Sequence, residues 1–353
     1  MLMTEHNNKL SSLQSDALRI ATFLATVMVV LRHSFNLHRY YAGGNPWMPI
    51  TDANIAIQHT LSGITNMAIP AFFFMSGFLF FRDMQKWQDC IPKWQKRIRT
   101  LLVPYFLWNL MLITMVLLLY VFPALRPQLL EKYDVKLSSY WLLNKMTLHP
   151  IMGHFWYIRT LMIFMLCVPL VFYILKNNAL AFIVLFILAR CWKPIDTTIL
   201  SSEGALYFYC GCWIATHGGL PEAMPVSHWI WLFIVPIYSY IMPLILSRSI
   251  IIPGGIAVIM YIGWQVCLLL AKVSLLRNWL LSLNQHSFFI YALHGIFISG
   301  ITLFVSRHIS HTPFNSLLAY CFTFVSTLII CLILSIITKK VVPHCYSILS
   351  GGR

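Results

Sequence analysis

The chain has 353 residues, of which 59% are hydrophobic and only 10% are charged. This composition lies far outside the usual range for a soluble domain and indicates a polytopic membrane protein. The formal net charge of +15 would suggest nucleic-acid binding in a soluble protein. Here most basic residues flank apolar runs, as the positive-inside rule predicts, so we expect membrane lipid and no nucleic acid as a partner.

Ten apolar runs approach the length of about 20 residues that a helix needs to cross a hydrocarbon core of about 30 Å. In chain order they cover 18–36, 60–81, 100–122, 154–175, 178–193, 203–217, 228–247, 252–273, 284–306 and 314–338. The fifth and sixth runs are short. The sequence predicts an all-α, polytopic fold with about ten transmembrane helices. We expect one membrane domain over 1–353, with short cytoplasmic tails at 1–17 and 340–353.

The distribution of positive charge predicts the orientation of these spans. An even number of spans places both termini on one side, and residues 1–17 contain no apolar stretch typical of a cleaved signal peptide. With the termini inside, fourteen of the twenty-five lysines and arginines fall on the inner side. We therefore expect both termini in the cytoplasm.

Acidic residues and cysteines argue against two kinds of site. All ten acidic residues fall outside the spans or at their edges, whereas a proton-coupled transporter usually needs a carboxylate at membrane depth. The nine cysteines are scattered, mostly within apolar runs, and no spacing matches a zinc or disulfide framework. We expect no metal site.

The first span carries a basic residue near each end. From Arg19 to His33 is 14 residues, or about 1400° at about 100° per residue, some 40° short of four turns. The two side chains therefore share one helix face, roughly 21 Å apart along the axis. A fixed cation at the inner end suits an anionic donor, and an imidazole near the outer end suits proton removal from a hydroxyl group. The alternative is an interfacial pair, Arg32 and His33, whose side chains reach toward lipid headgroups.

Five stretches with recognisable motifs occur in order along the chain. They are "SDALRIATFLATVMVVLRH" (15–33), "IPAFFFMSGFLFF" (69–81), "KRIRTLLVPYFLWN" (96–109), "HFWYIRTLMI" (154–163) and "SFFIYALHGIFI" (287–298). Together they resemble the acyltransferase-3 family of bacterial inner-membrane O-acyltransferases, which modify cell-surface carbohydrates with acetyl or similar groups. The resemblance covers about residues 15–300 and implies about ten membrane helices.

The resemblance assigns catalysis to the first span. In the family an arginine and a histidine of the first helix are required for transfer, and they match Arg19 and His33. The usual pattern has ten residues between the two, whereas this chain has thirteen. The added residues rotate the pair by only about 60° and lengthen it by about one turn, so the shared face is roughly kept.

The resemblance also implies a donor site. The basic loop after the SGF motif resembles the family's loop for the phosphates of coenzyme A, and the motif falls on Lys96, Arg97 and Arg99. Arginine suits phosphate because its planar fork binds two oxygens at once. Arg159 matches the arginine of a "WF...R" pattern, but Thr160 stands where many relatives have aspartate. Arg159 therefore needs another partner, either donor phosphate or backbone carbonyls. The alternative for the loop cations is plain positive-inside bias.

Five further residues are expected to support the substrate or the structure: Ser76, Trp156, Tyr157, Tyr291 and His294. Ser76 lies in the family's SGF turn, where we expect either a nucleophilic serine or close helix packing through Gly77. Tyr291 and His294 share a helix face in the family's YxxH position. Either residue orients a substrate or forms a hydrogen bond between helices.

Other histidines and aromatic residues are expected near the outer surface. His149 and His154 flank the mouth of the fourth span, so we expect them at the rim of an outer entrance. Four aromatic residues either stack on a sugar or belong to an interfacial belt: Tyr40, Tyr41, Trp47 and Trp156.

These features predict a membrane O-acyltransferase of the bacterial inner membrane. We expect an acyl group, most simply acetyl, to pass from acyl-CoA, the donor substrate, to a hydroxyl of a cell-surface or lipid-linked saccharide acceptor. No permanently bound cofactor is expected. Two alternatives stay open: a polytopic carrier or exporter of polysaccharide precursors or small acids, and a membrane scaffold for surface-polymer synthesis in which His33 is dispensable.

Overall fold

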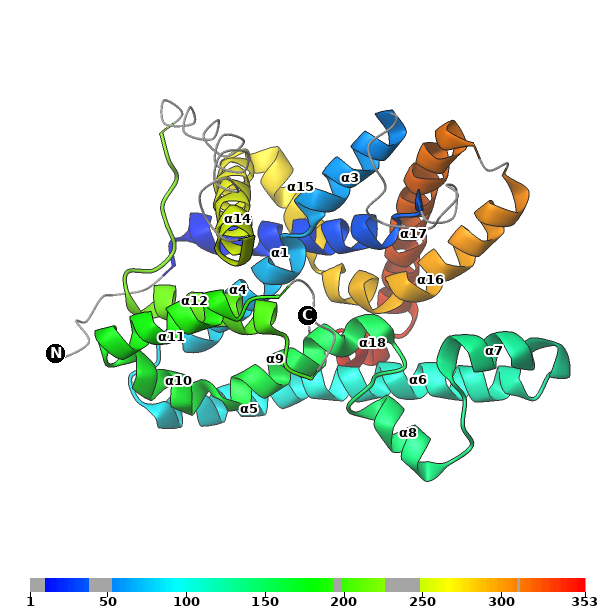
Figure 1. The fold of residues 1–353 in the computed structure, drawn as a ribbon, viewed down its shortest axis with the longest axis horizontal. Helices are drawn as coiled ribbons and strands as arrows, with labels where there is room; N and C mark the ends of the chain where they lie inside the picture. The colour runs from blue at the N-terminus through cyan, green and yellow to red at the C-terminus, as the bar shows by residue number, and fades with distance from the viewer. Residues whose placement is uncertain (1–9, 38–52, 194–198, 226–247, 310–311, 353) are drawn as a thin grey trace.

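The computed structural model describes residues 10–37, 53–193, 199–225, 248–309 and 312–352. Every regular element in these ranges is a helix, so the prediction of an all-α fold is confirmed. Helix α1 (Ser12–His33) crosses the middle of the molecule, and helices from the first and last parts of the chain pack against it (Figure 1).

The first half of the chain combines long helices with short ones. After α1 come α3 (Ala53–Thr65), α4 (Ala68–Phe81), α5 (Cys90–Arg97), a π-helix (Ile98–Leu102), α6 (Val103–Tyr120), α7 (Arg126–Tyr133), α8 (Ser139–Met146), α9 (Trp156–Leu166) and α10 (Val168–Leu175). Short 3₁₀ turns occur at Trp87–Asp89, Pro123–Leu125 and Gly153–Phe155.

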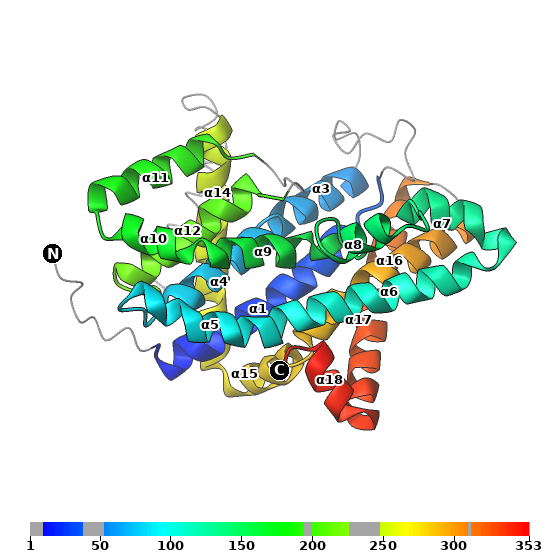
Figure 2. The same ribbon diagram turned by 90° about the horizontal axis from the view of Figure 1, so that it is seen from below.

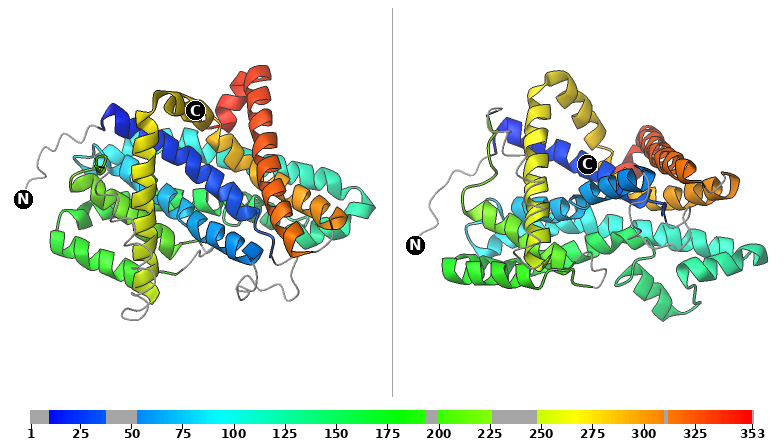
Figure 3. Two further views of the ribbon diagram at one scale, coloured as in Figure 1. Left: turned by 90° about the horizontal axis from the view of Figure 1, so that it is seen from above. Right: turned by 45° about the horizontal axis from the view of Figure 1, so that its top comes forward.

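The second half of the chain completes the bundle. It comprises α11 (Asn178–Arg190), α12 (Ser202–Thr216), α14 (Arg248–Lys272), α15 (Ser274–Asn284), α16 (Ser287–His308), α17 (Pro313–Val341) and α18 (Pro343–Leu349). Helix α14 crosses α1 and contacts it (Figure 3).

Six helical segments of the described chain are long and apolar enough to cross a membrane: Ser12–His33, Ala53–Phe81, Trp87–Tyr120, Ile252–Lys272, Ser287–His308 and Phe314–Val341. A seventh is formed if Gly153–Leu166 and Val168–Leu175, bent by 55°, count as one span. The protein is therefore a polytopic membrane protein, but the count of about ten spans is not confirmed.

Three predicted spans account for the difference between the ten spans expected and the seven found in the described chain when the bent pair counts as one. Two of them form α11 and α12, which have 13 and 15 residues and so extend only about 20 and 22 Å at 1.5 Å per residue. Both are shorter than a hydrocarbon core of about 30 Å. The third, 228–247, lies outside the described residues.

Helix α1 begins six residues before the apolar run because a polar cap starts it. Ser11 Oγ accepts a hydrogen bond from the backbone N–H of Gln14, and Gln14 Oε1 accepts one from the N–H of Ser11, both at 3.1 Å. This reciprocal capping box satisfies donors that the first helical turn leaves free. The helix then runs to His33, three residues short of the predicted end.

The second span is broken between α3 and α4, and Arg32 binds at the break. Arg32 Nη1 donates to the carbonyl oxygen of Ser62 at 3.3 Å and to Asn66 Oδ1. The carbonyl oxygen of Ser62 also accepts a hydrogen bond from Thr65 Oγ1 at 2.9 Å, so Arg32 adds a second donor to a carbonyl near the end of α3. The guanidinium of Arg32 is thus part-buried and bonded to the break of a span.

Helices α5 and α6 form one long rod joined by the π-helix (Figure 2). Single π-helical turns are rare in proteins overall, but those that occur are often located at functional sites. The extra residue of a π-turn changes the rotation of α5 relative to α6, and Arg97 is the residue directly before this turn.

Helices α4 and α12 are in backbone contact through two glycines. A Cβ atom built on Gly77 would lie 2.2 Å from the carbonyl oxygen of Phe208, and one built on Gly211 would lie 2.1 Å from that of Phe74. Small residues allow such close approach between membrane helices. Gly77 therefore has the packing role that the SGF motif suggested.

The end of the chain folds back onto the bundle instead of leaving it as a tail. Trp108 Nε1 on α6 donates to the carbonyl oxygen of Leu349 at 3.0 Å. Gly351, with φ of 71°, lies so close to the π-helix that a Cβ atom would be 2.3 Å from the carbonyl oxygen of Thr100. The C-terminal residues thus support the rod formed by α5 and α6.

Candidate active site

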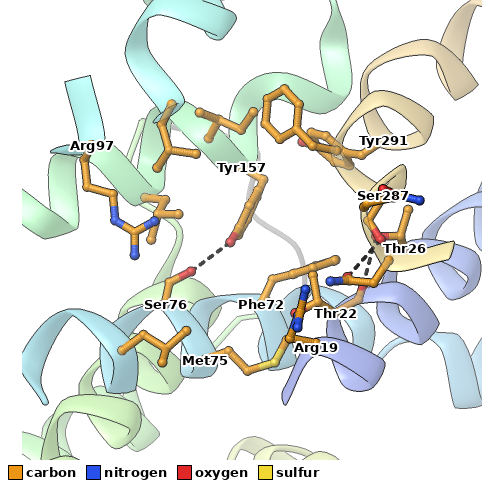
Figure 4. Close-up of a pocket in the computed structure, with 17 residues that line it drawn as sticks. Arg19, Thr22, Thr26, Phe72, Met75, Ser76, Arg97, Tyr157, Ser287 and Tyr291 are labelled. Carbon is orange, nitrogen blue, oxygen red and sulfur yellow. Dashed lines mark hydrogen bonds between the residues drawn. The ribbon is translucent and has the colours of Figure 1, made fainter. Parts of the chain in front are cut away.

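A cavity of about 390 Å³ lies between α1, α4, α9 and α16, and we name it the Arg19 cavity (Figure 4). Five of the residues singled out in the sequence line it: Arg19, Ser76, Arg97, Tyr157 and Tyr291. Its other polar residues are Thr22, Thr26, Asn284, Gln285 and Ser287, and its apolar wall is formed by Phe72, Met75, Leu79, Leu101, Ile158, Leu161 and Phe288.

Two guanidinium groups face the Arg19 cavity. Arg19 comes from α1 and Arg97 from the last residue of α5, and in Figure 4 both point toward the space beside the hydroxyl of Tyr157. Neither forms an ion pair with a described residue, and the residues that line the cavity include no carboxylate. The cavity is therefore suited to an anion.

This arrangement separates the three loop cations that the sequence analysis grouped together, Lys96, Arg97 and Arg99. Arg97 lines the cavity, whereas Lys96 and Arg99 are exposed and do not line it. Adjacent helical residues point about 100° apart, so consecutive cations cannot all face one cavity.

Ser76 and Tyr157 connect two walls of the Arg19 cavity. The hydroxyl oxygens of Ser76 on α4 and Tyr157 on α9 are 3.3 Å apart, within hydrogen-bonding distance (Figure 4). No histidine is among the residues that line this cavity, so Ser76 has no base at the position that serine activation requires.

A second cavity, of about 340 Å³, contains His33, and we name it the His33 cavity. His154 and His294 also line it, together with Lys132 and Tyr133 of α7 and residues of α6 and α16. Among the described residues no group of three or more His, Cys, Asp or Glu is arranged to hold a metal ion. The three histidines are therefore not a metal centre in this geometry.

The two cavities lie on either side of a partition formed by Tyr291 and His154. Tyr291 lines the Arg19 cavity, and its hydroxyl donates to the carbonyl oxygen of His154 at 2.5 Å. The ring of His154 lines the His33 cavity. Helix α1 extends along both cavities, since Arg19 lines one and His33 the other.

Two predicted site residues lie elsewhere. Arg159 is buried, and it donates to the carbonyl oxygen of Leu148 and, at 3.4 Å, to Thr160 Oγ1. It therefore binds a backbone carbonyl, one of the two partners expected from the sequence, and it does not line the Arg19 cavity. Trp156 packs near Phe73, with ring centroids 6.3 Å apart, and lines neither cavity.

The two histidines expected at an outer rim differ in the structure. His149 is exposed, and its Nδ1 lies 2.9 Å from Asn144 Oδ1. His154 packs against Tyr291 and His294 and lines the His33 cavity. The residues Tyr40, Tyr41 and Trp47 lie outside the described residues.

A buried carboxylate was missed by the sequence analysis. Glu203 lies in the first turn of α12, is only 3% exposed, and interacts electrostatically with Arg32. The sequence analysis placed Glu203 at the edge of a span because the apolar run 203–217 begins at this residue. Packing of α12 inside the bundle, which a hydropathy pattern does not show, is what buries it.

The helices and the two cavities define an all-helical, polytopic membrane protein with an arginine-lined pocket and a histidine-lined pocket along one helix. A comparison with protein families matches the acyltransferase-3 family (Acyl_transf_3), described as an acyltransferase domain, over residues 16–336, so the chain belongs to this family. The protein is therefore a membrane acyltransferase. Comparisons with curated proteins and with solved structures find no match.

Proposed function

We propose that the protein takes an acyl group, most simply acetyl, from acyl-CoA and transfers it to a hydroxyl of a cell-surface or lipid-linked saccharide. The setting is the bacterial inner membrane, with both termini in the cytoplasm. The donor binds in the Arg19 cavity, and the acceptor binds in the His33 cavity.

The composition of the Arg19 cavity supports donor binding. Arg19 and Arg97 attract phosphate oxygens, and neither is neutralised by an ion pair with a described residue. The apolar wall suits the thioester end of the donor. A volume of about 390 Å³ is too small for a whole nucleotide thioester, so part of the nucleotide stays outside. The exposed cations Lys96 and Arg99 then attract this part electrostatically.

The composition of the His33 cavity supports acceptor activation. His33 is a general base that removes the proton of the attacking hydroxyl, a role that histidine fills most often. Lys132 and Tyr133, at the same cavity, offer hydrogen-bond donors to a saccharide.

The observation that carries the proposal is the position of α1 relative to the cavities. One helix places a cation in the first cavity and an imidazole in the second, and the partition of Tyr291 and His154 lies between them. A donor and an acceptor bound on the two sides of this partition are brought near each other. The partition must then open for the hydroxyl to reach the acyl carbon, because the reaction needs the two atoms about 3–3.5 Å apart.

The proposal is tested with membrane vesicles that contain the protein and acetyl-CoA labelled in its acetyl group. Label should enter the saccharide fraction. The variant His33→Ala should lower the rate by about 10² to 10⁴-fold, the usual contribution of a general base. His149→Ala is the matched control, because His149 is an exposed histidine that lines neither cavity. Equal transfer by both variants would remove His33 from the mechanism.

One observation favours a second candidate, a carrier of small acids or polysaccharide precursors. Glu203 is a buried carboxyl group within electrostatic range of Arg32, and proton-coupled transporters use such groups. Proteoliposomes loaded with labelled acetate distinguish the two. A carrier releases the label in response to a pH gradient and loses this response in Glu203→Gln. An acyltransferase of the proposed kind releases none.

A further inference from the structure

Three histidine rings from different parts of the chain meet at the partition. The ring of His294 on α16 is central: its centroid lies 5.3 Å from that of His33 and 4.4 Å from that of His154. All three line the His33 cavity. The proposed function uses only His33.

Backbone carbonyls fix which nitrogen of each ring carries the hydrogen. His294 Nδ1 lies 2.6 Å from the carbonyl oxygen of Tyr291, and His154 Nε2 lies 3.2 Å from that of Ala292. A carbonyl only accepts, so these two nitrogens must donate. The neutral rings therefore keep a lone pair on His294 Nε2 and on His154 Nδ1. His294 Nε2 is buried and has no hydrogen-bond partner among the described residues.

Gly295 makes room for His154. A Cβ atom at this position would lie 2.7 Å from His154 Nδ1 and 2.9 Å from His154 Cε1. Both atoms belong to a ring that also packs against Tyr291, with centroids 5.2 Å apart, so the ring cannot move away freely. The absence of a side chain at Gly295 thus allows His154 to contact α16.

We propose that His294 and His154 are positioning residues that accept and hold the proton that His33 removes from the acceptor. This inference rests on the proposed acyl transfer. The O–H bond of the acceptor breaks, its oxygen bonds to the acyl carbon, and the C–S bond of the thioester breaks. His33, now an imidazolium, gives a proton to His294 Nε2 and returns to the neutral form.

The proton then remains at the partition until the leaving thiolate takes it. His294 keeps its Nδ1 hydrogen on the carbonyl of Tyr291 while Nε2 carries the transferred proton, and His154 Nδ1 offers the next lone pair. Tyr291 itself lines the Arg19 cavity, where the sulfur is released. Overall, one proton moves from the acceptor oxygen to the donor sulfur, and the products are an ester and a free thiol.

The first experiment separates proton transfer from structure at position 294. His294→Asn keeps an N–H that can reach the carbonyl of Tyr291 but has no nitrogen lone pair. With labelled acetyl-CoA and membrane vesicles, kcat should fall by about tenfold or more while KM for acetyl-CoA stays unchanged. Added imidazole should restore part of the kcat of His294→Ala, which a purely structural role would not allow.

The second experiment uses two glycines of α16. Gly295→Ala should displace His154 and lower kcat, whereas Gly300→Ala should leave kcat unchanged because a Cβ atom there meets nothing within 4 Å. If the His294 variants fail to fold, the comparison of Gly295→Ala with Gly300→Ala still tests the proposed role of His154. Equal kcat values for Gly295→Ala and Gly300→Ala overturn the role of His154.

The outcomes also separate this inference from the function on which it rests. If the wild-type protein transfers label and His294→Asn retains full kcat, the acyl transfer stands and the role of His294 is overturned. If the wild-type protein transfers no label, both proposals fall.

Discussion

Arg19 and Arg97 face one cavity from α1 and from the end of α5, although neither has a carboxylate partner among the described residues. Replacing Arg97 by alanine should therefore weaken donor binding. A hydrogen bond to a charged group contributes about 1.5–3 kcal/mol, so KM for acetyl-CoA should rise roughly 10- to 100-fold. Steady-state kinetics with labelled acetyl-CoA measures this change.

Lys96→Ala is the control for this prediction. Lys96 is adjacent in sequence but exposed, so its attraction for the donor is screened and its loss should raise KM much less. The difference between wild type and Lys96→Ala should shrink further at high salt. Equal increases in KM for Arg97→Ala and Lys96→Ala would contradict the conclusion that Arg97 lines the donor cavity and Lys96 does not.

Ser76→Ala should leave most of the transfer activity. The hydroxyl of Ser76 interacts with that of Tyr157 at 3.3 Å, and a neutral hydrogen bond contributes only about 0.5–1.5 kcal/mol. We therefore expect a rate loss below about tenfold. Mass spectrometry of the protein after rapid mixing with acetyl-CoA should find no acetyl group on Ser76. Complete inactivation together with a trapped acetyl-serine would instead establish a nucleophilic serine.

Gly77→Ala and Gly211→Ala should both be strongly destabilising. The added methyl group would lie 2.2 or 2.1 Å from a carbonyl oxygen. Relieving this clash requires a shift of the helix backbone, which costs more free energy than the rotation of a side chain. Overpacking typically costs about 1–3 kcal/mol, and here it acts on backbone atoms. Thermal unfolding in detergent micelles measures the loss. Gly255→Ala is the matched control, since a Cβ atom at Gly255 meets nothing within 4 Å, and it should be neutral or slightly stabilising.

His286, which lies between α15 and α16, should make the protein less stable in mild acid. Burial and then the nearby charge of Lys339 lower the pKa of this histidine from its ordinary 6.5. Its neutral ring lies 2.8 Å from Ser335 Oγ and 3.2 Å from the hydroxyl of Tyr346, which holds α18 in place.

Because the folded-state pKa is lowered, the unfolded chain binds the proton first as the pH falls. The stabilisation is therefore complete above the ordinary pKa of 6.5 and is lost as the pH falls below it toward the lowered value. The midpoint of thermal unfolding should decrease between about pH 7.5 and about pH 5.5, and His286→Asn should reduce this decrease. An unchanged pH dependence in His286→Asn would show that another group is responsible.

Much of the fold follows from hydropathy, and the deviations have local causes. The first span was located from its apolar run, but its start depends on the capping box of Ser11 and Gln14, which lies in polar sequence. The fourth span is bent at the start of α10, where Pro169 is the second residue of the helix. The burial of Glu203 comes from the packing of α12 on α4, and apolar periodicity contains no information about which helices become neighbours.

The candidate site was predictable only along single helices. Helical geometry placed Arg19 and His33 on one face of α1, and the structure has them lining two adjacent cavities. The choice of Arg97 over Lys96 depends on which face α5 turns toward the cavity, and the sequence of the loop does not show this. The position of His154 depends on contacts with α16, far away in sequence. The requirement for a residue without a side chain at Gly295 arises only because His154 packs against it.

The backbone contact between α4 and α12 limits how the donor pocket can open. Two helices whose main chains touch at Gly77 and Gly211 can neither slide past each other nor separate without breaking that fit, so they move as one rigid plate. Ser76 and Met75 are carried on this plate. Room for entry of a bulky thioester must therefore come from the facing side of the pocket, through a shift of the rod that carries Arg97 or of the turn that joins α15 to α16.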